Sequence, residues 1–159
     1  VAALGLPGEV ALSVARRGKA LGGSLTYLLE GALAVTTAKA RRMRLTIDGV
    51  EEAPAAYHLV AAANTSTFGG GMKLAPGADA EDGLLDLLMI SDMTRAELMA
   101  LLPRAYSGGH IGRPGVTLRK ARRIEIFPEE SLPLNIDGDA DGFSPAVFEV
   151  LPKAIAFRC

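Results

Sequence analysis

Short segments with alternating apolar and polar residues fill the second half of the chain. This period of two is typical of strands with one buried and one exposed face. Gly, Pro, Asn, Asp and Ser separate the segments, which favours tight turns between neighbouring strands. The segments that we expect to be strands are 116–119, 122–127, 132–137, 146–150 and 154–158. A chain with this pattern must pack the apolar faces of its strands against other elements.

Three earlier segments extend the set of strands. Residues 43–47 alternate in the same way and lead into Asp48-Gly49, a favoured hairpin-turn sequence. Residues 57–63 and 84–90 are short apolar runs, which indicates strands buried on both faces. About eight short strands with few helices predict a mixed α+β fold that is mainly β. We expect a β-sandwich or distorted barrel with N-terminal helices and one inserted helix, not a βαβ nucleotide-binding sheet.

The first third of the chain is expected to be helical. Apolar residues recur at helical spacing within residues 10–15 and again within residues 25–33. Ser24 is a candidate N-cap for the second of these helices. The pattern therefore predicts that strands begin only at about residue 42.

One further helix is expected between the two halves of the strand pattern. Residues 93–98 have the spacing of a capping box, formed by Thr94 and Glu97, with a hydrophobic staple around it. Pro103 should kink or shorten this helix, because proline removes a backbone donor. The glycines of residues 107–109 should end it.

Length and charge limit the classes of protein that fit. The 159 residues suit a single domain, expected to span residues 1–159. The 17 Lys and Arg nearly balance the 18 Asp and Glu, so nucleic acid is not an expected partner. The apolar runs are far shorter than the roughly 18 residues of a membrane span.

The lone Cys159 suits a reducing, cytoplasmic setting. The start at Val1, without Met, suggests a fragment.

Three consecutive glycines, Gly69, Gly70 and Gly71, need a physical reason. Glycine permits positive φ and close approach, so this loop could receive a phosphate or simply let two strands pass closely. The loop is not a Walker motif, because Lys73 is followed by Leu74 and not by Ser or Thr. It does not fit the dinucleotide fingerprint either, since it lacks a strand-to-helix context.

Two acidic stretches are candidate sites. Asp79, Glu81, Asp82 and Asp86 lie within eight residues, and plain solvation, a basic partner or a hard cation such as magnesium would relieve this crowding of charge. Residues 135–142 read Asn-Ile-Asp-Gly-Asp-Ala-Asp-Gly. They favour a hairpin turn, with an acid/base or metal role as the alternative.

A calcium loop is the weakest interpretation of residues 135–142. The twelfth position of such a loop requires Glu, and the chain has Phe148 there. His58 and His110 have no neighbouring Cys or His at ligand spacing, so we expect both to be structural. The basic residues at 41–44 and 119–123 are expected to be solvated strand ends, or contacts for phosphate or lipid headgroups.

Together, the glycine-rich and acidic motifs resemble the C-terminal part of the diacylglycerol kinase, sphingosine kinase and bacterial lipid kinase superfamily. The resemblance covers nearly the whole chain. Weaker similarities lie at residues 4–10, at residues 22–29, which resemble a Gly-x-x-x-Tyr helix, and at residues 152–154. The most specific segments resemble the GGG, APxA and DGxLD consensus: Gly69-Gly70-Gly71-Met72, Ala75-Pro76-Gly77-Ala78 and Asp82-Gly83-Leu84-Leu85-Asp86.

The resemblance implies a two-domain enzyme that transfers the γ-phosphate of ATP to a lipid hydroxyl. ATP would be bound mainly by an N-terminal α/β domain with a GGDGT motif, which these 159 residues lack. The chain alone would then be an inactive fragment of an ATP-dependent lipid kinase with a role in lipid metabolism. A non-catalytic lipid-binding domain on the same scaffold and a calcium-binding β-sandwich module are the alternatives.

The resemblance also implies roles for individual residues. Asp139 matches the catalytic acid of an Asp-Gly-Glu triplet, with Asp in place of the family's Glu. Asp82 matches a carboxylate ligand of a structural Mg²⁺, to which Asp79 and Leu84 would contribute through the main chain. Gly69, Gly70 and Gly71 are the candidate cofactor-binding residues.

The expected partners follow from the same resemblance. They are a lipid with a free hydroxyl, such as diacylglycerol, and the missing N-terminal domain of the same polypeptide. Exposed apolar residues near a sheet edge are expected where that domain docks, and they could also pair two copies in a homodimer. The expected location is cytoplasmic, with peripheral contact at the inner membrane face.

Overall fold

The computed structural model describes residues 1–17 and 31–154. Its helices are α1 (Leu6–Arg17) and α3 (Arg95–Ala105), and residues 31–37 form a further helical segment. Its strands are β1 (Ala2–Gly5), β2 (Arg41–Ile47), β3 (Val50–Glu51), β4 (Ala55–Ala63), β5 (Leu85–Ser91), β6 (Val116–Ala121), β7 (Arg123–Pro128), β8 (Pro133–Ile136), β9 (Asp139–Phe143) and β10 (Ala146–Glu149). The N-terminal part of the predicted helix 25–33, with its cap, and the predicted strand 154–158 beyond residue 154 lie outside the described residues.

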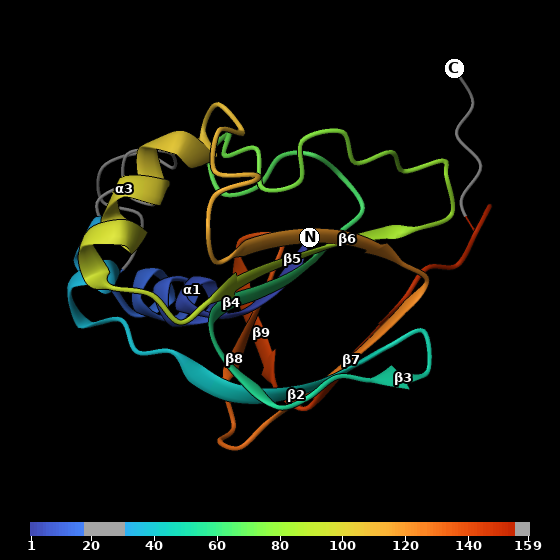
Figure 1. Ribbon diagram of the computed structural model, residues 1–159, viewed down its shortest axis with the longest axis horizontal. Coiled ribbons are helices and arrows are strands. Elements are labelled where there is room, and N and C mark those ends of the chain that lie inside the picture. The colour runs from blue at the N-terminus through green and yellow to red at the C-terminus, as the bar shows by residue number, and fades with distance from the viewer. Residues whose placement is uncertain (18–30, 155–159) are drawn as a thin grey trace.

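The strands form one antiparallel sheet that branches at β4 and curls over itself (Figure 1). One branch has the order β6-β5-β4-β1-β8-β9. The other begins where β2 pairs with the first residues of β4, Arg41 opposite Tyr57, and continues through β7 to β10. This arrangement confirms the predicted mainly β fold, a curled sheet with a few helices.

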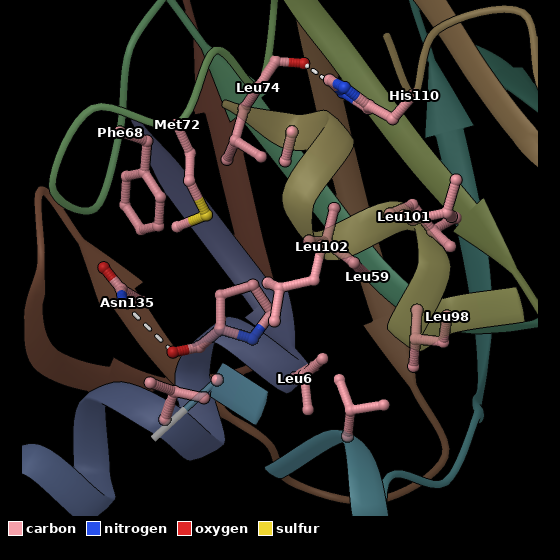
Figure 2. A pocket seen from close by; sticks show the side chains of 16 residues that line it. Leu6, Leu59, Phe68, Met72, Leu74, Leu98, Leu101, Leu102, His110 and Asn135 are labelled. Carbon is pink, nitrogen blue, oxygen red and sulfur yellow. Dashed lines mark hydrogen bonds between the residues drawn. The ribbon is translucent and has the colours of Figure 1, made fainter. Parts of the chain in front are cut away.

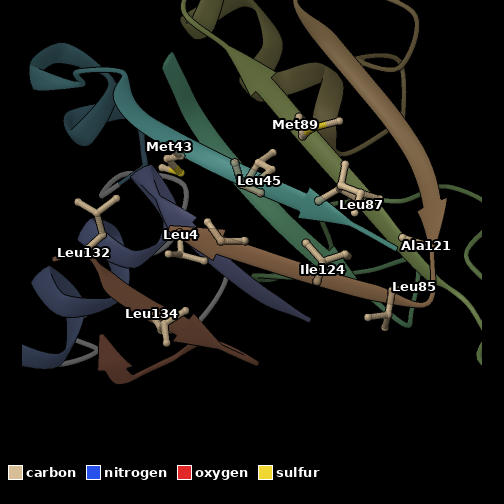
Figure 3. Packing of buried hydrophobic residues seen from close by; sticks show 14 residues of the cluster. Leu4, Met43, Leu45, Leu85, Leu87, Met89, Ala121, Ile124, Leu132 and Leu134 are labelled. Carbon is tan, nitrogen blue, oxygen red and sulfur yellow. The ribbon is translucent and has the colours of Figure 1, made fainter. Parts of the chain in front are cut away.

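Two apolar cores explain why β4 and β5 lack alternation. Val60 and Ala62 belong to a core that also contains Leu45 and Ile124 from the other branch of the sheet. Figure 3 shows this core. Leu59 and Ala61 point the other way, into a core covered by helices. Both faces of β4 are therefore buried from His58 to its end, which confirms the predicted two-faced burial.

Among the described residues, α1 packs against β1, β8 and β9, while α3 and the helical segment 31–37 cover the outer face of β4 and β5. Leu98 and Leu101 of α3 pack there together with Val35 of the helical segment 31–37. Figure 1 shows α1 and α3 gathered at one end of the molecule, away from β3. Within residues 1–17 and 31–154, no helix is long and apolar enough to cross a membrane.

The prediction that strands begin at about residue 42 is wrong, because residues 2–5 form β1. This short strand lies between β4 and β8, with Ala3 opposite both Ala61 and Asn135. Four residues are too few to show a periodic pattern. The strand forms because its neighbours supply partners on both edges.

Both Asp-Gly pairs form the predicted hairpin turns. Asp48 and Gly49 have φ of 50° and 82°, and Asp137 and Gly138 have φ of 50° and 101°. Two successive positive φ values match the twist of the flanking strands, which is why Asp-Gly is favoured. The second turn has only two residues between its strands, because β8 ends at Ile136 and β9 begins at Asp139. It is shorter than the predicted stretch of residues 135–142.

The α3 helix begins as predicted. Glu97 Oε2 accepts a hydrogen bond from the Thr94 backbone at 2.8 Å, and the Thr94 side chain accepts one from the Glu97 backbone at 3.3 Å. Leu98 is buried and Met93 packs against the same core, which completes the staple. The helix ends at Ala105, two residues after Pro103.

Gly8 lets α1 pack directly against β8. A Cβ added at Gly8 would lie 2.0 Å from the carbonyl oxygen of Pro133, a distance that real Cβ contacts essentially never show. The first turn of α1 therefore touches the backbone of β8 without a side chain between them.

We predict that Gly8→Ala lowers the free energy of unfolding by about 1–3 kcal/mol or more, because the helix has to shift away from β8. Gly31→Ala is the matched control. Its Cβ would lie 3.8 Å from Leu102, an ordinary contact, and alanine is the better helix former there by about 0.5–1 kcal/mol. Urea denaturation of both variants checks this. Equal stabilities of Gly8→Ala and the wild type would contradict it.

Candidate functional site

An apolar pocket lies between the helices and the outer face of the sheet (Figure 2). Its walls come from α1, the helical segment 31–37, α3, β4 and the loop after β4, and its polar lining side chains are His110 and Asn135. The lining residues are Leu6, Pro7, Val10, Gly31, Val35, Leu59, Phe68, Met72, Leu74, Ile90, Leu98, Leu101, Leu102, Ala105, His110 and Asn135. Apart from these two polar side chains the lining is apolar, so the pocket favours apolar groups.

The three glycines form the tip of a turn in the wall of this pocket. Phe68 and Met72 exchange two backbone hydrogen bonds of 2.8 and 2.9 Å, and Gly69, Gly70 and Gly71 close the turn with φ of 51°, 76° and 100°. A side chain at any of the three would be strained. The turn directs Phe68 and Met72 into the pocket, a role that the sequence did not reveal. The cofactor-binding role of the glycines stays a prediction.

His110 joins two walls of the pocket. It is 1% exposed, and its Nε2 lies 3.2 Å from the carbonyl oxygen of Leu74. Burial lowers the pKa of His110, although the carbonyl groups nearby favour its charged form. His58 is also buried, with Nε2 3.1 Å from the carbonyl oxygen of Met93. Both histidines therefore hold backbone segments in place, as predicted.

Asn135 connects the pocket to the hairpin that carries Asp139. Its side chain is 1% exposed and lines the pocket. Its Nδ2 donates a 3.1 Å hydrogen bond to the carbonyl of Pro7 (Figure 2). Its Oδ1 accepts a 2.9 Å bond from the backbone of Gly138. The start of α1, the pocket wall and the Asp137-Gly138 turn are therefore held by one side chain.

Asp139 is the first residue of β9, directly after this turn. It pairs with Ile136 across the hairpin, and its side chain is exposed. An exposed carboxylate on a rigid hairpin can accept a proton from a bound molecule. Sequence reasoning did not assign a role to Asn135. A polar residue at an inward position just before an Asp-Gly turn was the available signal.

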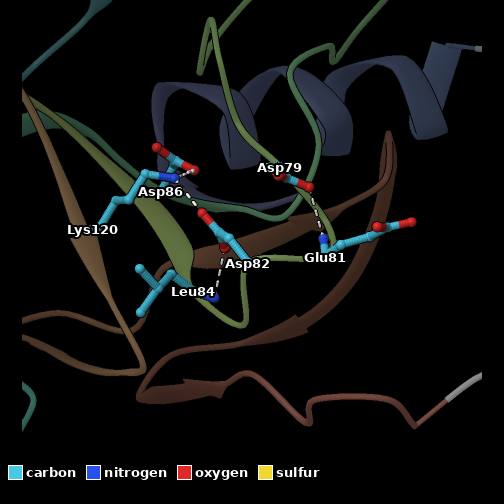
Figure 4. A network of polar contacts seen from close by, with 6 residues as sticks. All are labelled: Asp79, Glu81, Asp82, Leu84, Asp86 and Lys120. Atoms are coloured by element: carbon cyan, nitrogen blue, oxygen red, sulfur yellow. Dashed lines mark hydrogen bonds and ion pairs between the residues drawn. The ribbon is translucent and has the colours of Figure 1, made fainter.

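The acidic loop is held by hydrogen bonds and one ammonium group (Figure 4). Asp79 Oδ1 accepts the backbone N–H of Glu81 at 2.9 Å. Asp82 Oδ1 accepts the backbone N–H of Leu84 at 2.8 Å, and Asp82 Oδ2 lies 2.5 Å from Nζ of Lys120. The Lys120 hydrogen bond, followed by that from Leu84, lowers the pKa of Asp82. The same hydrogen bond with Asp82 raises the pKa of Lys120.

The expected magnesium ligands do not fit a metal ion as they are arranged. Carboxylate oxygens are the correct kind of donor. However, both oxygens of Asp82 are already engaged, and Leu84 presents its N–H to Asp82. Across residues 1–17 and 31–154, no three His, Cys, Asp or Glu side chains are grouped so that they could hold a metal. A magnesium site at Asp79, Asp82 and Leu84 stays a prediction, and it would require Lys120 to move.

The acidic loop and the Asp139 hairpin lie toward opposite edges of one sheet branch. The loop precedes β5, and three strands, β4, β1 and β8, separate β5 from β9 in the strand order. The structure therefore brings together Asn135, the pocket and the hairpin of Asp139, and it keeps Asp79, Asp82 and Leu84 apart from them.

Comparison with known proteins identifies the domain. Residues 2–159 match the family described as the YegS C-terminal NAD kinase beta sandwich-like domain. A diacylglycerol kinase of Mycobacterium tuberculosis is 30% identical over 135 residues, which cover 84% of this chain and 43% of that protein. A diacylglycerol kinase of Bacillus subtilis is 28% identical over 148 residues, which cover 92% of this chain and 48% of that protein.

A solved structure shows the same fold. It is described as a putative diacylglycerol kinase from Bacillus anthracis, with a TM-score of 0.67 and 21% sequence identity, covering 95% of this chain and 48% of that one. The chain thus spans less than half the length of these relatives. With a family match over nearly its whole length, the chain belongs to the C-terminal, β-sandwich-like domain family of the diacylglycerol-kinase-like lipid kinases.

Proposed function

We propose that this chain is the acceptor-side domain of an ATP-dependent lipid kinase, a transferase that phosphorylates the hydroxyl of diacylglycerol or a related lipid. The observation that carries the proposal is the apolar pocket that ends at Asn135, next to the hairpin of Asp139. The names of the relatives support the kinase class, because they are diacylglycerol kinases.

In this proposal the pocket holds a hydrocarbon tail of the lipid. The lining from Leu98 and Leu102 of α3 to Phe68 and Met72 of the glycine turn offers contacts for methylene groups along its length. Each buried methylene contributes about 0.8 kcal/mol to transfer from water. A lipid held in this way would have its polar end near Asn135, where the hairpin begins.

Asp139 then acts as the general base. Its carboxylate accepts the proton of the lipid hydroxyl while the hydroxyl oxygen forms a bond to the γ-phosphorus of ATP. The bond from that phosphorus to the leaving oxygen of ADP breaks in the same step. Aspartate offers the same carboxylate as glutamate on a side chain one methylene shorter, so the reacting hydroxyl has to lie correspondingly closer to the backbone of β9.

ATP in this proposal binds mainly to the half of the relatives that this chain does not cover. Magnesium, as the usual companion of ATP, supplies positive charge to its phosphates. The glycine turn remains a candidate contact for those phosphates, since three successive glycines with positive φ allow a phosphate to approach the backbone closely.

In this proposal, the other half of the polypeptide docks over apolar side chains near Asp139. Ile136 and Phe143 are 39% and 61% exposed, and both lie on the β8–β9 hairpin with Asp139. β9 is an edge strand of the sheet. Covering these side chains would close the site over Asp139, with pairing of two copies as the alternative use of this edge. The proposal also includes peripheral contact with the inner membrane face, where the enzyme would meet its lipid substrate.

Two other functions remain as alternatives. A lipid-binding domain without catalysis would use the same pocket but not Asp139. A calcium-binding module would use Asp137, Asp139 and Asp141, but the structure places Asp137 in the turn and Asp139 and Asp141 on β9. Activity measurements on Asp139 variants separate the first alternative from the proposed kinase.

We predict that Asp139→Asn in the full-length protein lowers kcat for lipid phosphorylation by about 10²–10⁴, because a general base typically contributes that factor. The melting temperature should not change, since the side chain is exposed. Asp141→Asn, two residues along the same strand, is the matched control and should keep activity within about twofold. Asp139→Asn activity within about tenfold of the wild type would exclude the assignment.

We predict that Leu102→Trp raises KM for a long-chain lipid acceptor, because the larger ring fills the pocket between α3 and the segment 31–37. Loss of about two to four methylene contacts corresponds to roughly a 15- to 200-fold rise. A short-chain acceptor should be affected much less. Val147→Trp, at an exposed position of β10, is the control. Equal effects on short and long acceptors would argue against a tail in this pocket.

A further inference from the structure

Lys120 lies between two carboxylates from the acidic loop and β5. Its Nζ is 2.5 Å from Oδ2 of Asp82 and 3.4 Å from Oδ2 of Asp86 (Figure 4). Asp86 is directly opposite Lys120 in the β5–β6 pairing, so the sheet itself sets this position. The Asp86 side chain is 5% exposed and that of Asp82 is 25% exposed. A buried carboxylate requires a positive partner, and Lys120 provides it.

The ammonium group does what a divalent cation would do at this place. It neutralises one of the two negative charges and links the loop to the neighbouring strand β6. Because it is attached to the chain, it does not have to be recruited from solution. A magnesium ion would have to take Oδ2 of Asp82 from Lys120, and it would also need near-octahedral geometry from further oxygens. The described part of the loop does not group a third acidic side chain with Asp82 and Asp86.

The backbone N–H of Leu84 occupies the other oxygen of Asp82. It donates to Oδ1 of Asp82 at 2.8 Å, so this carboxylate oxygen already has a hydrogen-bond donor. Both oxygens of Asp82 thus have donors at hydrogen-bond distance without any ion. The loop is fully paired at this residue.

We propose that Lys120 takes the place of a divalent cation at the acidic loop, so that the loop of this protein is held without magnesium. Removal of the ammonium group should leave Asp82 and Asp86 with uncompensated negative charge and so create an affinity for magnesium. This inference concerns the structure of the loop and does not depend on the proposed lipid kinase activity.

The test is the melting temperature of the full-length protein in 10 mM MgCl₂ and in EDTA, without nucleotide. The wild type should melt within about 1 °C in the two buffers. Lys120→Met should melt lower in EDTA and should regain roughly 3–6 °C with magnesium, if magnesium is present at about ten times its dissociation constant. Lys120→Arg keeps the positive charge and should not respond to magnesium.

Arg119→Met is the matched control. Arg119 is the preceding residue of β6 and makes an exposed ion pair with Glu52 at 2.7 Å, away from the loop. This variant should not respond to magnesium. A wild type that magnesium stabilises by 3 °C or more would overturn the proposal, because the ion would then bind beside Lys120. A folded Lys120→Met variant whose melting temperature does not change with magnesium would also overturn it. The loop would then not bind a divalent cation even without the ammonium group.

A measurement on the wild type covers the case in which Lys120→Met does not fold. Backbone amide resonances of residues 79–86 are followed by NMR while Mn²⁺, a paramagnetic substitute for magnesium, is added to millimolar concentration. The proposal expects no selective broadening in this loop. Selective broadening around Asp82 would show that a divalent ion binds there despite Lys120, and the proposal would be wrong.

Discussion

The burial of β4 on both faces is the constraint on which the rest of the domain depends. This strand pairs with β5 along one edge and with β1 and β2 along the other. Because β2 leaves β4 after three paired residues and continues with β7, the sheet divides and curls. One face of β4 then meets the inner core and the other meets the helices. A polar residue at Val60 or Ala61 would lie in one of the two cores, far from water.

The same division explains where the pocket lies. Sheet residues such as Leu59 and Ile90 present apolar side chains outward, and α1, α3 and the segment 31–37 cover them. The pocket lies in the space between these helices, the loop after β4 and the sheet (Figure 2). Asn135 stands at the junction of this space with the inner hairpin. Its two hydrogen bonds make the hairpin geometry depend on the position of α1.

Local patterns in the sequence predicted the local structure well. The Asp-Gly turns, the capping box at Thr94 and the two-faced burial of β4 each depend on a few neighbouring residues, which the sequence displays directly. β1 and β9 were not predicted, because β1 has only four residues and β9, with the sequence Asp-Ala-Asp-Gly-Phe, is largely exposed. Neither has an apolar pattern of its own. Their strand character comes from the partners beside them.

The candidate site also has parts that the sequence predicted and parts that it did not. Asp139 could be singled out from its motif, but the pocket could not, since its walls come from segments as distant as Leu6 and His110. The pairing of Lys120 with Asp82 joins residues 38 positions apart and depends on the β5–β6 register. Sequence similarity to a metal-binding loop carries the identity of the carboxylates. It does not carry the identity of the cation, because a lysine on a neighbouring strand can supply positive charge to the same carboxylates.

The exposure of Asp139 also has a consequence for the proposed reaction. A general base for phosphoryl transfer must reach the lipid hydroxyl while water is kept from the γ-phosphate, since water would otherwise accept the phosphoryl group. In this domain alone the hairpin is open, with Phe143 61% exposed beside it. In the proposed function, the lipid tail is held by a pocket whose described walls come from this chain. These walls do not cover Asp139, so excluding water there would require another part of the polypeptide. The proposed lipid binding and the proposed catalysis therefore differ in what they require from the rest of the polypeptide.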